Sequence, residues 1–522
     1  MRVLLPQLSI LLLTFAACGG RTQPYGLAST DASTDTSTDG TQPEPPPCVT
    51  DADCASDDAC IVYRCMDAAC VEVFRRSCDD GDPCTTDDCD PATGECQYAP
   101  STFDLDQDGY RGPLPGYRAG APGACGDDCD DTRAAAHPGG LETCDGVDND
   151  CNGVIDDNSV YVPDSSEPVR LSSDDLAQSS PGGLAFDGTF YAASYQGQLD
   201  HWSNYFHGLT ANGATAIAPK RIATVGSDSF SGPILWNGSV FATVWEDRRD
   251  NDYEIYFNRL DSDGDKLGPD VRVSEGLDFS LHPSFFWDGS RYVIVWDDLR
   301  EGLSQIYGRL LSVDGEPLTE EIALTDPELE AENPSIVPGS TTLGMVFKYG
   351  PSDDQRIGFR TVSSDLEEVG TLVGPASERA VSPAIAASGG RFFIAWHTRS
   401  GRGPGDSIYG AVLTEDSKLV VPEKQITFDA KFARTKTWLP LGDRMLLIWG
   451  ADYGEGYDLY TKMLTLDLDN AGSRVPITST GTDSVSPMAV FGPEGDVGVL
   501  FRDSRDGPWQ TFFARLRCQA GR

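Results

Sequence analysis

Residues 283–296 read Pro-Ser-Phe-Phe-Trp-Asp-Gly-Ser-Arg-Tyr-Val-Ile-Val-Trp, and residues 306–311 read Ile-Tyr-Gly-Arg-Leu-Leu. The first stretch holds two β-rich runs joined by Asp288-Gly289. It predicts a hairpin, because both central residues of such a tight turn take positive φ. A second turn at Asp314-Gly315 and the run 321–325 complete four short strands with no helical period. The stretch therefore predicts a four-stranded antiparallel unit.

This unit recurs at intervals of about 51 residues, and a fixed period in this range is typical of repeat architectures. Its prolines stand at Pro181, Pro233, Pro283, Pro334, Pro383 and Pro487. An aromatic residue keeps the same interval at Tyr195, Trp245, Trp296, Phe347, Trp396, Trp449 and Phe501. A unit near Trp438 lacks its proline. Seven units of four strands predict a mainly β chain with a seven-bladed β-propeller at residues 165–518.

The ends of the repeat region indicate how the ring closes. A short strand at 169–172 precedes the first unit, and the last unit ends at 513–516 without a following copy. We expect these two segments to pair, because an open ring would leave an unpaired edge. The repeat resembles the seven-bladed propeller repeats of bacterial surface proteins. The residues that carry the resemblance are Val244-Trp245-Glu246-Asp247-Arg248-Arg249 with Ile255-Tyr256, and Val295-Trp296-Asp297-Asp298 with Ile306-Tyr307.

The start of the chain predicts export. Residues 1–17 form a targeting segment, with Arg2 before a short apolar run and small residues at its end. Phe15-Ala16-Ala17-Cys18 resembles a bacterial lipobox, which implies lipidation of Cys18 and an outer-membrane lipoprotein on the periplasmic or cell-surface face. Ordinary secretory cleavage is the alternative. Residues 18–47 are rich in Thr, Ser, Asp, Gly and Pro and predict a disordered tether after the lipidated cysteine.

Cysteine is dense in residues 48–100. Two quartets share their first spacings: Cys54, Cys60, Cys65, Cys70 and Cys78, Cys84, Cys89, Cys96. An exported segment this short predicts disulfides, because it cannot build a sufficient apolar core. Zinc is the alternative, but the segment has no histidine and no Cys-x2-Cys pair. Cys48, which lies before the two quartets, and Cys518, at the far end of the propeller, are expected to pair with each other.

Residues 101–158 carry the clearest chemical signal. Asp104, Asp106 and Asp108 occupy positions 1, 3 and 5 of a loop with Gly109 at position 6, as in the first half of an EF-hand loop. Pro115 stands where the acid at position 12 belongs, so a later acid must supply that ligand. A second loop repeats the pattern. The predicted metal ligands are Asp104, Asp106, Asp108, Asp128, Asp130, Asp131, Asp148, Asp150, Asn152, Asp156 and Asp157. Acidic turns without a metal are the alternative.

The same segment resembles the MopE-type metal-binding motif of bacterial surface proteins. The resemblance rests on Asp104 to Tyr110, Asp128-Cys129-Asp130-Asp131, Pro138-Gly139, Glu142-Thr143-Cys144-Asp145-Gly146 and Asp148 to Gly153. It implies metal binding. The copper site of that family depends on a modified tryptophan and histidines, whereas this segment has no tryptophan and only His137. Hard oxygen ligands favour Ca²⁺ over copper.

The sequence contains no recognisable catalytic constellation. Its five histidines share no metal-ligating spacing, and no phosphate-binding glycine loop is present. The propeller loops place Asp and Arg together in several blades, which predicts structural ion pairs. A net charge of −43 argues against nucleic acid and anionic membranes as partners. We therefore expect a monomeric, calcium-stabilised surface scaffold that is not an enzyme.

The partner of such a scaffold would be a surface protein or a glycan, and the membrane would be reached through the N-terminal lipid alone. The alternative is an exported hydrolase or lyase that acts on glycans in the central depression of the propeller. Acids clustered with a histidine around the centre of the ring would favour that alternative.

Overall fold

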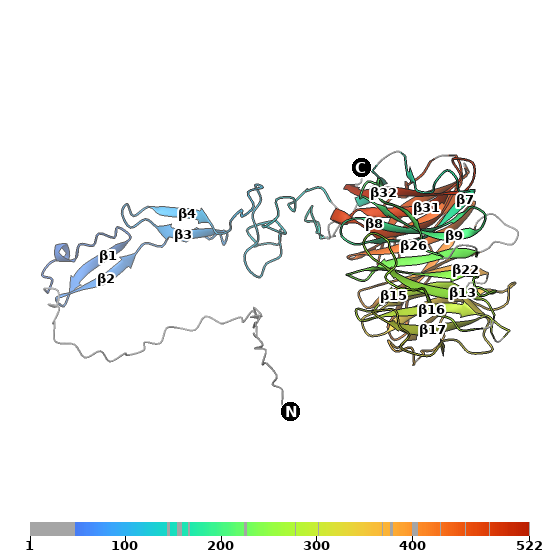
Figure 1. The fold of residues 1–522 in the computed structure, drawn as a ribbon. Coiled ribbons are helices and arrows are strands. Elements are labelled where there is room, and N and C mark those ends of the chain that lie inside the picture. Colours follow the sequence, from blue (N-terminus) through green and yellow to red (C-terminus); the bar gives the residue numbers. More distant parts are fainter. Residues whose placement is uncertain are drawn as a thin grey trace, which may run out of the picture. The chain divides into compact units, whose positions relative to one another are not determined.

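The computed structural model describes residues 47–520 except 143–146, 154–158, 165–166, 224–226, 277, 301, 368, 376–378, 399–405, 429, 455 and 480 (Figure 1). The predicted leader, Cys18 and nearly all of the tether lie outside these residues, as do Asp156 and Asp157. Two compact units are present: Met1–Asp80 with Asp87–Tyr98, and Gly81–Thr86 with Ala99–Arg522. No helix in the described ranges is long and apolar enough to cross a membrane.

The cysteine-rich part consists of short elements with little apolar burial. They are η1 (Asp51–Cys54), β1 (Ile61–Met66), β2 (Ala69–Arg75), β3 (Thr85–Cys89) and β4 (Cys96–Pro100). β1 pairs with β2, and β3 pairs with β4. The β1–β2 turn needs two left-handed residues, Asp67 and Ala68. Every residue of β2 is exposed, so the covalent bridges must supply the stability that a core would supply elsewhere.

The disulfides confirm the general prediction and correct two details. The described bridges are Cys48–Cys65, Cys54–Cys70, Cys60–Cys89, Cys78–Cys96, Cys84–Cys125 and Cys129–Cys151. The predicted Cys48–Cys518 bridge is wrong, because Cys48 lies 5.7 Å (Cα–Cα) from Cys65 at the end of β1. Cys518 is also part of a disulfide. Cys60 and Cys84 also bond outside their own quartets.

Seven antiparallel sheets follow, and in each the strands are ordered by sequence. The first contains β7 (Gln178–Phe186), β8 (Tyr191–Gln198), β9 (Trp202–Leu209) and β10 (Thr215–Arg221). The second contains β11 (Ser229–Trp236), β12 (Phe241–Asp247), β13 (Glu254–Leu260) and β14 (Val271–Arg272). The third contains β15 (Ser280–Trp287), β16 (Arg291–Asp298), β17 (Gln305–Ser312) and β18 (Ile322–Ala323).

The remaining sheets keep this plan with local variations. The fourth contains β19 (Ala331–Pro338), β20 (Leu343–Tyr349) and β21 (Arg356–Val362), and its outer segment adds an isolated bridge between Phe359 and Val373. The fifth contains β22 (Ala380–Ser388), β23 (Arg391–Thr398), β24 (Ile408–Thr414) and β25 (Leu419–Gln425). The sixth contains β26 (Phe432–Leu441), β27 (Arg444–Asp452), β28 (Tyr457–Thr465) and β29 (Val475–Pro476). The seventh contains β30 (Ser484–Phe491), η2 (Pro493–Gly495), β31 (Val497–Asp503) and β32 (Gln510–Ala520).

The seven sheets form a closed ring of blades, as predicted. The first strand of every blade contacts the first strand of the next, and β30 contacts β7. The seventh blade is completed from the N-terminal side by β6 (Val169–Arg170), which pairs with Phe512 and Phe513 of β32. A further strand, β5 (Ser159–Pro163), pairs with the end of β32. This double pairing leaves no open edge at the junction of the two ends.

The repeated residues explain the repeated shape. Register shifts occur at the repeated prolines, for instance between Leu281 and Ser284, and His282 adopts a φ of +52° there. The 288–290 hairpin forms, but only Gly289 has positive φ, because Asp288 Oδ1 instead accepts the backbone N–H groups that follow. The aromatic landmarks are buried between blades: Trp296 packs with Ile255 of the preceding blade. They are inter-blade packing residues.

Candidate metal centre

The first acidic loop lies in the segment between β4 and β5, where the described residues form no helix or strand. Gly109 has a φ of +99°, and its backbone N–H donates to Oδ2 of Asp104 over 3.1 Å. The glycine therefore turns the chain back over the first carboxylate. As a result, Asp104, Asp106 and Asp108 bring carboxylate oxygens within 4.8 Å of one another.

The next acidic run folds onto this loop. Asp106, Asp128 and Asp131 also bring carboxylate oxygens within 4.8 Å of one another. The backbone N–H of Leu105 donates to Oδ1 of Asp131 over 3.0 Å and holds the two runs together. Gly112 makes this approach possible, because a Cβ there would come within 2.8 Å of the Cβ of Asp131. We call the five acids 104, 106, 108, 128 and 131 the first carboxylate cluster.

The first carboxylate cluster has the electrostatics of a cation site. Asp128 is fully buried. Burial raises its pKa, a hydrogen bond from the N–H of Asp130 opposes this, and the charges of Asp108, Asp106 and Asp131 raise it further. Buried Oδ2 atoms of Asp106, Asp108 and Asp128 have no hydrogen-bond partner, and the described ion pairs include none to these acids. Converging buried carboxylates without compensation are costly unless a cation joins them.

Asp130 lies outside this cluster, although the sequence analysis includes it among the ligands. Its Oδ1 accepts a hydrogen bond from Oγ1 of Thr132 over 2.6 Å. Its Oδ2 lies 3.3 Å from Nε of Arg133. The side chain is therefore already paired with local groups, which makes Asp130 a natural control for its neighbour Asp128.

The second acidic loop repeats the geometry of the first. The N–H of Gly153, at φ +92°, donates to Oδ2 of Asp148 over 2.8 Å. The N–H of Asn152 donates to the carboxylates of Asp148 and Asp150, each over 3.1 Å. Carboxylate oxygens of Glu142, Asp148 and Asp150 lie within 4.8 Å of one another. We call these three acids the second carboxylate cluster.

Glu142 is the acid that the sequence analysis left out of the ligand set. It is buried, and one of its oxygens accepts the N–H of Asp150 over 2.7 Å. The chain must fold back for Glu142 to reach the loop eight residues later. The only signal in the sequence was its place in the resemblance to the MopE-type motif.

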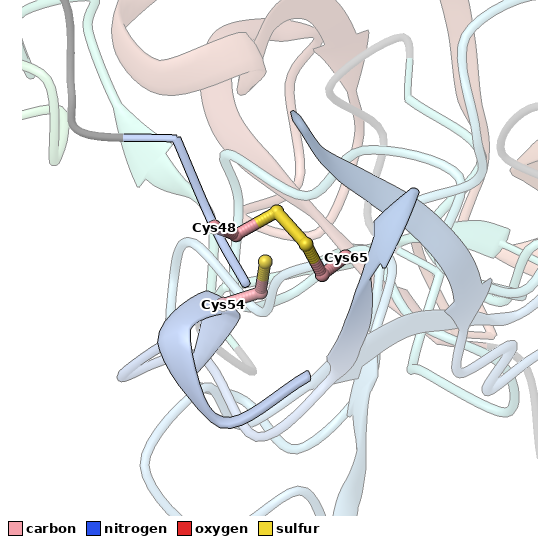
Figure 2. A group of neighbouring side chains, drawn as sticks. All are labelled: Cys48, Cys54 and Cys65. Atoms are coloured by element: carbon pink, nitrogen blue, oxygen red, sulfur yellow. A yellow bond between two sulfur atoms is a disulfide. The ribbon is translucent and has the colours of Figure 1, made fainter. Parts of the chain in front are cut away.

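Sulfur atoms also gather in two places, but they are committed to disulfides. Figure 2 shows Cys48 bonded to Cys65 beside Cys54, and Cys54 is itself bonded to Cys70. In the acidic segment, Cys129 is bonded to Cys151 and links the two carboxylate clusters. A metal needs the free thiolate, so these sulfur atoms are structural.

His137 does not join either carboxylate cluster. Its ring stacks on Tyr110 with a centroid distance of 4.7 Å and an interplanar angle of 6°. Its Nδ1 lies 3.4 Å from the carbonyl oxygen of Pro138. The donors that the described segment gathers are thus carboxylate oxygens, which suit hard cations.

The acidic and basic propeller loops form ion pairs within each loop, as expected. Asp247 pairs with Arg249 at 2.6 Å, and the corresponding distance from Asp298 to Arg300 is also 2.6 Å. Asp503 pairs with Arg505 at 2.8 Å. In the second and third blades the acid also accepts the indole N–H of the landmark tryptophan over 3.2 Å. These contacts fix the loops to the blade core.

One group of acids with a histidine joins the second and third blades: Glu246 lies on β12, His282 on β15 and Asp297 on β16. Nδ1 of His282 donates to Oδ1 of Asp297 over 2.9 Å, and the N–H of His282 donates to Glu246 over 2.7 Å. Burial raises the pKa of Glu246. For His282, burial acts in the opposite direction, but the hydrogen bond and charge of Asp297 outweigh it and raise the pKa.

Comparison with known protein families supports the interpretation of the acidic segment as a metal-binding motif. Residues 128–157 match a MopE copper-binding family model described as "Putative metal-binding motif", and residues 77–100 match the Dictyostelium (slime mold) repeat. Protein psiF of Dictyostelium discoideum is 44% identical over 48 residues. That match covers 9% of this chain and spans only 7% of the length of psiF.

Solved structures share the propeller region at low similarity. A neuraminidase-like protein of subtype N10 from a bat influenza A virus matches 69% of this chain and 100% of its own, with 10% identity and a TM-score of 0.40. The Dos1 propeller matches 68% of this chain and 95% of its own, with 13% identity and a TM-score of 0.40. An endo-arabinase from Bacteroides thetaiotaomicron matches 45% of this chain and 92% of its own, with 10% identity and a TM-score of 0.31.

Proposed function

We propose that this protein is a lipid-anchored, calcium-stabilised surface protein whose propeller is a binding scaffold. The observation that carries the metal part is the first carboxylate cluster, in which one fully buried acid and four half-buried acids converge without a compensating base. Its residues would be Asp104, Asp106, Asp108, Asp128 and Asp131. Glu142, Asp148 and Asp150 would hold a second ion. A bound cation would neutralise each cluster and fix the two loops.

Calcium suits these donors better than copper does. Ca²⁺ takes six to eight oxygen ligands in flexible geometry, whereas copper sites use imidazole or sulfur donors. The nearest histidine, His137, is stacked on Tyr110, and the nearby sulfur atoms of Cys129 and Cys151 are bonded to each other. The ion would act structurally, because the clusters present acids and no nucleophile.

The anchor and the partner are further parts of the proposal. The lipobox-like run before Cys18 supports attachment to the outer membrane through lipid alone. The tether would hold the folded parts away from the membrane, where the propeller could reach a surface protein or a glycan. Membrane fractionation with and without the Cys18→Ala substitution tests the anchor, because a protein that loses its lipid in the variant would move to the soluble fraction.

Calorimetry on the full-length protein tests the metal sites. After chelation, Ca²⁺ should bind at two sites and raise the unfolding temperature. Calcium at one hundred times its Kd stabilises the folded state by about 2.7 kcal/mol per site. Asp128→Asn should remove one site, whereas Asp130→Asn should retain both. Absence of heat and of any melting shift would overturn the calcium proposal, and equal effects of both variants would overturn the ligand assignment.

A second candidate function is glycan hydrolysis or elimination, and the Glu246–His282–Asp297 group favours it. A carboxyl whose pKa is raised by burial, beside a histidine and a second acid, is an arrangement suited to acid and base roles. Full-length protein would be incubated with a panel of polysaccharides while new reducing ends are measured. Activity that is lost in Glu246→Gln but kept in Asp314→Asn supports this function, and absence of product from the unmodified protein removes it.

A further inference from the structure

The sixth blade lacks the acid that the second, third and seventh blades have two positions after their landmark aromatic residue. In the second and third blades, the residue two positions after the landmark tryptophan is a buried aspartate that accepts the indole N–H and pairs with an arginine. At that position the sixth blade has Ala451, and Tyr453 replaces the arginine. Trp449 is 1% exposed, and its Nε1 has no hydrogen-bond partner.

The residues around this position also carry fewer acids than those of the third blade. In the third blade, Arg300 pairs with Asp298 and Glu321, and Arg309 pairs with Glu275. The strand registers place Lys462 at the position of Arg309, two residues after the tyrosine that opposes the landmark tryptophan. Arg474 precedes β29 as Glu321 precedes β18. The hydroxyl of Thr427 accepts the N–H of Ile408, as the hydroxyl of Ser274 accepts the N–H of Ile255. Phe428, which follows Thr427, therefore corresponds to Glu275, which follows Ser274.

A pocket of about 170 Å³ opens where these substitutions meet. Its walls are Ile426, Thr427, Phe428, Trp449, Tyr453, Lys462 and Arg474. Within the described residues neither Lys462 nor Arg474 has an acid at ion-pair distance, although the chain carries a net charge of −43. Arg474 stacks on Tyr453, with its guanidinium carbon 3.6 Å from the ring centroid. Burial, and then the charge of Arg474, lowers the pKa of Lys462.

We propose that this pocket binds an oxyanion, which takes the place of the carboxylate missing from the sixth blade. Lys462 and Arg474 would supply charge, and the buried indole N–H of Trp449 would supply a directed hydrogen bond. The aromatic walls Phe428 and Tyr453 suit an acidic sugar, in which a carboxylate stands beside an apolar ring face. The inference rests on the proposed role of the propeller as a binding scaffold, and it is independent of the carboxylate clusters.

Titration calorimetry of the full-length protein in chloride-free buffer tests the site with four probes: sulfate, phosphate, glucuronate and glucose. Binding of glucuronate above the inorganic anions identifies an acidic sugar, and binding of sulfate or phosphate alone identifies a free oxyanion. Both results support an oxyanion site. Glucose that binds as well as glucuronate overturns it, as does absence of binding by all anions. Asp128→Asn should leave anion binding unchanged, which separates this test from the calcium proposal.

Two variants locate the site. Lys462→Met should weaken binding at least about tenfold, because it removes a charged hydrogen-bond donor. Lys424→Met is the matched control, since Lys424 pairs with Asp469 and does not line the pocket. Ala451→Asp should abolish binding by restoring an internal carboxylate beside Trp449. The indole resonance of Trp449 in a ¹⁵N-tryptophan sample should shift with anion in the unmodified protein. Unchanged affinity in both pocket variants, or no resonance shift, would overturn the proposal.

Discussion

Replacing Asp298 by asparagine tests whether the repeated ion pair holds a blade together. Asp298 is 0% exposed and accepts hydrogen bonds from Trp296 Nε1 at 3.2 Å, from Ser280 Oγ at 2.9 Å and from Arg300 at 2.6 and 2.8 Å. Burial acts against ionisation, but the contacts with Arg300 outweigh it, so the pKa of Asp298 lies below its ordinary value. The substitution keeps the volume of the side chain and leaves the guanidinium of Arg300 with less compensating negative charge.

Removing one partner of a buried pair costs about 3–5 kcal/mol. Arg300 keeps its contact with Glu321 and its side chain is 21% exposed, so we expect the lower end, about 3 kcal/mol. Urea unfolding followed by tryptophan fluorescence measures the loss. Asp314→Asn is the matched control, because Asp314 is 73% exposed and pairs with Arg259 at the surface, where a pair contributes about 0–1 kcal/mol. Equal costs for the two variants would refute the reasoning.

Two further predictions concern acid and reductant. Burial lowers the pKa of His207 from 6.5 to about 4, so the folded state loses about 3 kcal/mol as pH falls from 6.5 to 4. The midpoints of urea unfolding at pH 7 and pH 4.5 measure this loss of stability. The difference between the two midpoints should be smaller in the His207→Gln variant. Reduction should unfold the cysteine-rich part while the propeller keeps its circular dichroism. The Cys60→Ser substitution alone opens a bridge across 29 residues and should cost about 3–4 kcal/mol. Protease resistance that persists around residues 61–75 after reduction would contradict this.

The fold was predictable because its signals are local and repeated. A proline, an aromatic residue and a turn return at a fixed interval, so each copy supports the interpretation of the others. The ring closure between β6 and β32 followed from counting strands. Disulfide pairing could not be obtained in this way, because Cys60 meets Cys89 only after two hairpins have formed. Similar spacing in the two quartets reflected related sequences and did not determine their bonds.

In the acidic site, too, local features were predictable from the sequence and long-range contacts were not. Positions 1, 3 and 5 of a loop face one centre by local geometry, so Asp104, Asp106 and Asp108 were accessible from sequence. The acid run that follows was also identified, but sequence could not separate Asp131, which reaches the cluster, from Asp130, which pairs with Arg133. Glu142 depends on the chain folding back onto Asp150. Such contacts have no local pattern.

Departures from the repeat carry more functional information than the repeat itself. A residue that recurs in several blades, such as Asp247, Asp298 and Asp503, fixes the loop of its blade to the blade core. The sixth blade gives up this aspartate and leaves the buried Nε1 of Trp449 without a partner, which costs stability unless another acceptor arrives. It also gathers Lys462 and Arg474 at one pocket, and Arg474 stands where the third blade has Glu321. The proposed anionic ligand would supply both an acceptor for the indole N–H and a negative charge beside the two bases.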